Sequence, residues 1–298
     1  MNCDGTLAKV ALNVLLPADG SGDASAIRWP GWRLGRMPFR TASEVLLPLA
    51  LVTVVSFAPF IGYDPGHAGG RAVLIALAGL TLLAAVTRRA RSFRLGLALS
   101  STIAAFALPW EVSWWPLPGA LGVLVYVLSC LIGRSAADPA IHFRLGKLTR
   151  TDGLIILSIA AVSAGFLYLF RAMMPPHQFL GDQLVIQIPA SLMLLAGILF
   201  ATANAAVEEL LFRGAIMHHL RYAFGVWPAV ALQAVAFGLL HLHGYPYGPI
   251  GVALATVYGL LLGAVRVRSN GLLAPWVAHV VADSVIFIFI LQAASGSS

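Results

Sequence analysis

The residues best suited to chemistry lie in a charged stretch, AVEELLFR at positions 206–213, that directly follows a long apolar run. Ionised side chains at the middle of a membrane cost about 2.5 to 3.5 kcal/mol each, so they usually face a cavity or a partner. Glu209 and Arg213 are spaced i,i+4 and can pair on one helical face. Glu208 points about 100° away from Glu209 and is left free to act as a general base or acid.

Two later apolar runs carry histidines at helical spacing. FGLLH places Phe237 and His241 on one face of a helix, and HVVAD does the same for His279 and Asp283. With a turn near 222–225, Glu208 and His241 each lie roughly 21 to 24 Å from that turn at 1.5 Å per residue, so the two side chains can meet. A carboxylate and an imidazole can activate water, and a second imidazole can stabilise an oxyanion. The alternative is a buried ion-pair network that only joins helices.

The elements that position these residues are membrane-spanning helices. The chain is 59% hydrophobic and only 10% charged, against about 25% charged in soluble domains, and its mean hydropathy is +0.86. About 20 apolar residues cross a bilayer as a helix. The sequence predicts an all-α polytopic transmembrane bundle of about eight to nine spans, at 44–61, 72–87, 95–110, 117–133, 153–170, 189–207, 226–240, 250–265 and 272–292.

The distribution of apolar runs and arginines predicts how the chain is divided into segments and how it is oriented in the membrane. Residues 1–40 are interpreted as a cytoplasmic or interfacial segment, 41–188 as transmembrane helices without a recognised motif, 189–292 as the catalytic domain and 293–298 as a short tail. The arginines flank apolar runs and fall on one side if the spans alternate, which predicts that this side and the N-terminus are cytoplasmic. They account for the formal charge of +7 without a nucleic-acid partner. The tryptophan-rich connection at 110–118 then belongs to the aromatic belt on the opposite side.

The three motifs together resemble a known family. EELLFR, FGLLH and HVVAD match, in order, the EExxxR, FxxxH and HxxxN/D signature of the CAAX-protease and bacteriocin-processing (Abi) family of glutamic-type intramembrane proteases. The resemblance covers about 189–292. It implies that Glu208 is the general base that activates water with His241, that Glu209 and Arg213 support the site, and that His279 and Asp283 line the oxyanion side.

One position departs from the better-studied members, which carry Asn where this chain has Asp283. A carboxylate donates a hydrogen bond only when it is protonated. Asp283 can instead accept a hydrogen bond from His279 Nδ1 and orient the ring. Two carboxylates and two histidines can also bind zinc, but the HExxH helix of a zinc protease is absent. The resemblance therefore favours catalysis without a cofactor, with zinc as the alternative.

The function predicted from these observations is an intramembrane endopeptidase that cleaves a membrane-associated protein or peptide, with CAAX-type processing of a lipidated substrate as one form. We expect an integral protein of the bacterial inner membrane. The alternatives are a non-hydrolytic immunity or scaffold protein and a proton-coupled transporter, since intramembrane Glu, Arg and His also build proton relays. The matched inverted halves of many transporters are not visible in the sequence.

Overall fold

A computed structural model describes residues 41–109, 115–132, 143–174 and 189–295. Every regular element in these ranges is a helix, so the predicted all-α class is confirmed. The predicted N-terminal segment 1–40 lies outside the described residues. The helices are α2 (Ala42–Ile61), α3 (Ala68–Val86), α4 (Ala90–Ala105), α6 (Leu117–Ile132), α8 (Arg150–Met173), η1 (Ala190–Leu192), α10 (Met193–Glu208), η2 (Glu209–Ile216), α11 (Met217–Phe224), α12 (Val226–Leu240), α13 (Gly248–Arg268) and α14 (Leu273–Ser295).

Each of the nine apolar runs falls on a helix of the described chain. Within that chain, six helices are long and apolar enough to cross a membrane. They are Ala42–Ile61, Ala68–Val86, Arg150–Met173, Met193–Phe224, Gly248–Arg268 and Leu273–Gln292. Two further apolar helices, α6 and α12, are shorter, and α4 begins with two arginines within its first five residues, ARSFR. The predicted polytopic bundle is therefore present, with some of its helices shorter than a full span.

The longest continuous helical segment carries the charged stretch 206–213. Met193–Phe224 is 32 residues long and changes from α-helix to π-helix at Glu209–Ile216. π-helical turns inside α-helices are frequent at functional sites, because the wider turn changes the direction of the side chains. At Gly214 there is no room for a side chain, since a Cβ there would lie 2.5 Å from the Phe143 ring.

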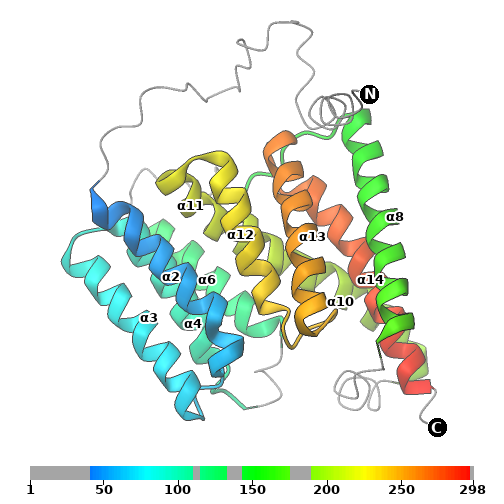
Figure 1. Ribbon diagram of the computed structural model, residues 1–298, viewed down its shortest axis with the longest axis horizontal. Coiled ribbons are helices and arrows are strands. Elements are labelled where there is room, and N and C mark those ends of the chain that lie inside the picture. Colours follow the sequence, from blue (N-terminus) through cyan, green and yellow to red (C-terminus); the bar gives the residue numbers. More distant parts are fainter. Residues whose placement is uncertain (1–40, 110–114, 133–142, 175–188, 296–298) are drawn as a thin grey trace, which may run out of the picture.

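The bundle joins an N-terminal and a C-terminal group of helices (Figure 1). α2, α3, α4 and α6 pack together, as do α8, α10, α13 and α14, and α12 contacts both α2 and α13. The largest core cluster joins the two groups, because Leu51 and Leu99 pack with Leu211, Phe212 and Phe237. The N-terminal helices are thus part of the wall behind the charged stretch.

Charged helix ends gather at one end of the bundle (Figure 1). Arg89 pairs with Glu44 at 3.0 Å, and Arg268 pairs with Asp152 at 2.8 Å. The Arg91 guanidinium stacks 3.8 Å from the centre of the Tyr222 ring. Other arginines lie elsewhere, since Arg71 donates to the Gly66 carbonyl oxygen at the start of α3 and Arg171 donates to the Phe289 carbonyl oxygen at the end of α8. The cytoplasmic side stays a prediction.

Candidate active site

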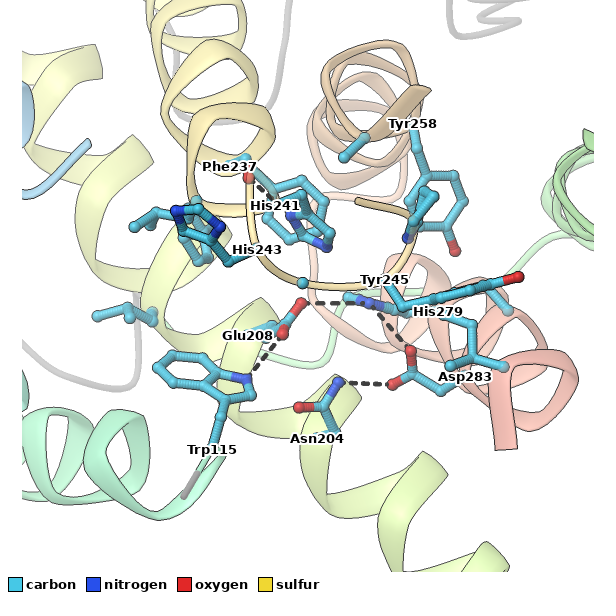
Figure 2. Close-up of a pocket in the computed structure, with 18 of the residues that line it drawn as sticks. Trp115, Asn204, Glu208, Phe237, His241, His243, Tyr245, Tyr258, His279 and Asp283 are labelled. Atoms are coloured by element: carbon cyan, nitrogen blue, oxygen red, sulfur yellow. Dashed lines mark hydrogen bonds and ion pairs between the residues drawn. The ribbon is translucent and has the colours of Figure 1, made fainter. Parts of the chain in front are cut away.

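A cavity of about 770 Å³ lies between the two groups of helices. Its wall is mostly apolar, and four of the six predicted site residues line it: Glu208, His241, His279 and Asp283. Figure 2 shows their side chains directed toward one another. The other two predicted residues, Glu209 and Arg213, are buried and do not line the cavity. Four of the predicted site residues therefore lie on the cavity wall, and the other two lie behind it.

Glu208 is the last residue of α10, and both of its carboxylate oxygens have a partner nearby. Oε1 accepts a hydrogen bond from the Trp115 indole Nε1–H at 2.8 Å. Oε2 lies 3.4 Å from Nε2 of His279, which is longer than most charge-assisted hydrogen bonds. Oε2 is therefore the less constrained oxygen.

Behind the cavity wall, Glu209 holds two cationic or polar partners at once. Its Oε1 accepts from Arg213 Nη1 at 2.8 Å and from Nδ1 of His279, also at 2.8 Å. The Arg213 guanidinium lies 4.5 Å from the centre of the Phe237 ring. The pair predicted from i,i+4 spacing is confirmed, although it sits in a π-helix, and it fixes the orientation of the His279 ring.

His241 follows α12 directly and presents one ring nitrogen to the cavity. Its Nδ1 lies 2.8 Å from the Phe237 carbonyl oxygen. A carbonyl can only accept, so Nδ1 carries the hydrogen and Nε2 of the neutral ring keeps its lone pair. The Phe237 ring lies 4.5 Å away, centre to centre, and closes one side of the imidazole. His241 thus has the form that a general base requires.

Asp283 does not make the contact with His279 that sequence reasoning allowed. Because Nδ1 of His279 is taken by Glu209, the expectation that Asp283 accepts from Nδ1 is wrong. Asp283 Oδ1 lies instead 3.7 Å from Nε2 of His279, and Oδ2 accepts from the Asn204 amide at 2.9 Å. The i,i+4 spacing placed both residues on one face correctly, but the rotation of α14 toward η2 decided which nitrogen each carboxylate meets.

Residues 189–285 match a family model described as Rce1-like, type II CAAX prenyl endopeptidase Rce1-like. This region is similar to the CAAX-protease family. The match contains all six predicted site residues. No curated protein and no solved structure matches the chain. The apolar helices of the described chain, together with this match, support an integral membrane protein.

Three polar residues of the cavity wall were missed by sequence reasoning. Trp115 lies outside the CAAX-protease match and was interpreted only as an aromatic-belt residue. Asn204 lies one helical turn before Glu208, and this spacing was a usable signal because it places both on one face of α10. Tyr258 lies on α13, between two motif-bearing helices, and nothing in its neighbouring sequence distinguishes it from a core residue. All three line the cavity.

The alternative of a zinc site depends on how the His, Asp and Glu side chains are arranged. Within the described residues, no group of three or more His, Cys, Asp and Glu side chains is arranged to hold a metal ion. Both ring nitrogens of His279 already face carboxylates of the protein.

Proposed function

We propose that the protein is an intramembrane endopeptidase that hydrolyses a peptide bond of a membrane-associated substrate. The observation that carries the proposal is the pairing of a held carboxylate, Glu208, with the free Nε2 of His241 on the wall of one largely apolar cavity. The family match agrees with this reaction class. A carboxylate and a neutral imidazole that face one space supply the acceptors needed to bind and deprotonate a water molecule.

The reaction follows from these positions. Glu208 and His241 hold a water molecule and take one of its protons while the water oxygen bonds to the carbonyl carbon of the substrate. The tetrahedral intermediate then collapses, the C–N bond breaks, and the amine leaves with the proton that water gave up. The acyl product is a carboxylic acid that keeps the water oxygen and its second hydrogen, and the other product is an amine. Transfer of that hydrogen to the amine gives the carboxylate and the ammonium group, so every atom of the water is accounted for.

His279 and Asp283 form the second side of the proposed site. Glu209 and Arg213 fix the His279 ring, and its Nε2 faces both Glu208 and Asp283 at distances above 3.3 Å. Because Nδ1 already donates to Glu209, a hydrogen on Nε2 requires the imidazolium form of the ring, which the neighbouring carboxylates stabilise. In that form the Nε2 hydrogen is not held tightly by either carboxylate and can bond to a carbonyl oxygen that gains negative charge. Asp283, which already accepts from Asn204, acts as a positioning residue on this side.

The shape of the cavity suggests how a substrate enters. Val162, Phe166 and Val257 line the cavity, yet they are 53%, 51% and 56% exposed. Val162 and Phe166 lie on α8, and Val257 lies on α13, so the cavity reaches the outer surface between these two helices. In a membrane this surface faces lipid. A peptide attached to an apolar helix or to a lipid chain can enter here without leaving the bilayer.

The test uses purified full-length protein in lipid nanodiscs and a panel of membrane-anchored peptides, lipidated and not, analysed by mass spectrometry. We expect the wild type to cleave at least one peptide, Glu208→Gln to cleave none, and a chelator to leave the wild-type rate unchanged. Glu44→Gln is the matched control, because this carboxylate pairs with Arg89 at the end of the bundle away from the cavity.

Each other outcome has a defined meaning. A rate that falls with the chelator and returns with added zinc contradicts catalysis without a metal. Wild-type and Glu208→Gln proteins that are equally inert on every peptide contradict the proposed function and favour an immunity or transport protein.

A further inference from the structure

The cavity wall contains a phenol that nothing above has used. Tyr258 lines the cavity, its hydroxyl oxygen is buried, and it has no hydrogen-bond partner among the described residues. A hydroxyl buried without a partner is unfavourable compared with a hydrogen atom in the same place. Phenylalanine would fill the space at lower cost, so the hydroxyl is best explained by a partner that arrives with the substrate.

Tyr258 is placed beside the reacting groups. Its ring packs edge-to-face against His279, with the ring centres 5.6 Å apart. In Figure 2 the Tyr258 and Glu208 side chains lie to either side of the His279 ring. It is also the only polar residue that α13 contributes to the cavity wall within the described chain. The Tyr258 hydroxyl thus comes from a helix that carries none of the three motifs.

The backbone that carries Tyr258 is held firmly. The Gln233 side chain is fully buried and donates to the carbonyl oxygen of Gly259, the next residue, at 2.9 Å. A Cβ at Gly259 would lie 3.1 Å from the Ala234 backbone, so α12 and α13 approach closely at this point. The phenol is therefore positioned before substrate binds, which is what electrostatic stabilisation of a transition state requires.

We infer that the Tyr258 hydroxyl donates a hydrogen bond to the carbonyl oxygen of the scissile peptide bond and to the oxyanion that forms there. The inference rests on the proposed function. The phenol keeps its proton throughout: it stabilises the negative charge while water adds to the carbonyl carbon and while the C–N bond breaks. Asp283 is an acceptor for Asn204, so Tyr258 and Nε2 of His279 are the donors on the oxyanion side.

The test is Tyr258→Phe in the full-length protein, with kcat, KM and the unfolding temperature measured on the peptide that the wild type cleaves. Loss of one oxyanion donor lowers kcat by about 10²- to 10³-fold, and we expect KM to change little because the interaction is made in the transition state. The unfolding temperature should stay the same or rise, because an unsatisfied hydroxyl is removed.

Tyr126→Phe is the matched control. The Tyr126 hydroxyl is buried too, but it has a partner, His219 Nε2, at 2.9 Å, and it does not line the cavity. We expect this variant to keep kcat and to unfold at a lower temperature. Removal of the Tyr258 hydroxyl should therefore lower kcat without lowering the unfolding temperature. Removal of the Tyr126 hydroxyl should lower the unfolding temperature without lowering kcat.

The inference can fail without the proposed function. Tyr258→Phe with wild-type kcat, in a protein that Glu208→Gln inactivates, overturns the oxyanion role alone. A variant that loses activity only through a higher KM or a lower unfolding temperature also overturns it, because that result indicates a binding or packing role. A wild type inert on every peptide overturns both.

Discussion

Trp115→Phe tests whether the N-terminal helices take part in the site. The indole N–H of Trp115 donates to Glu208 Oε1 at 2.8 Å, from a residue 93 positions earlier and outside the family match. A hydrogen bond to a charged group contributes about 1.5 to 3 kcal/mol. If that bond positions the carboxylate for water activation, its loss lowers kcat/KM by about 10- to 100-fold, since each 1.4 kcal/mol is a factor of about ten.

The assay compares kcat/KM and the unfolding temperature of wild type, Trp115→Phe and Trp276→Phe. Trp276 is the matched control, because its indole also donates one hydrogen bond, to the Thr202 carbonyl oxygen at 3.1 Å, but touches no carboxylate. We expect both variants to lose similar stability and only Trp115→Phe to lose the stated activity. Equal activity of the two variants would refute the positioning of Glu208 by Trp115.

Two further changes test the buried support and the entrance. Arg213→Met removes the cation from a pair whose side chains are 0% and 1% exposed, so we expect a loss of about 3 to 5 kcal/mol in the free energy of unfolding, measured by denaturant titration; a loss below about 1 kcal/mol would show that Glu209 does not depend on Arg213. Val257→Trp fills the opening between α8 and α13 at a residue that is 56% exposed, so KM should rise with an unchanged unfolding temperature, and an unchanged KM would place substrate entry elsewhere.

Local patterns predicted the parts of the structure that depend on neighbours in sequence. Apolar runs located the helices because the bilayer requires about 20 apolar residues per span. The i,i+4 spacing of Glu209 and Arg213 gave their pair. Counting from the turn near 222–225 put Glu208 and His241 at one height, and both line the same cavity.

Contacts set by the rotation of one helix against another could not be predicted in this way. Asp283 meets Asn204 rather than Nδ1 of His279, because α14 turns that nitrogen toward Glu209 on η2. The contact of Trp115 with Glu208 depends on how α6 packs against the π-helix, and no local pattern records it. The π-helix itself has no apolar period that distinguishes it from the α-helix on either side.

Hydrolysis inside a membrane requires water and peptide to meet, and the proposed function needs the cavity to admit both. Asp64, which lies just beyond the end of α2 opposite Glu44, lines the cavity. A hydrogen bond from the Gly66 backbone N–H, with a further contribution from His67, lowers the pKa of this exposed carboxyl, so Asp64 stays ionised and hydrated at neutral pH. The opening between α8 and α13 faces lipid instead.

Glu208 lies between these two routes. It ends the 16-residue α10, which places it roughly 24 Å along the rod from Met193 at 1.5 Å per residue. Asp64, Glu208 and Val257 line the same cavity, so under the proposed function water from the Asp64 end and a peptide from the bilayer side would meet at the carboxylate. If the arginine end is cytoplasmic, as the positive-inside rule predicts, the water route opens on the opposite side of the membrane.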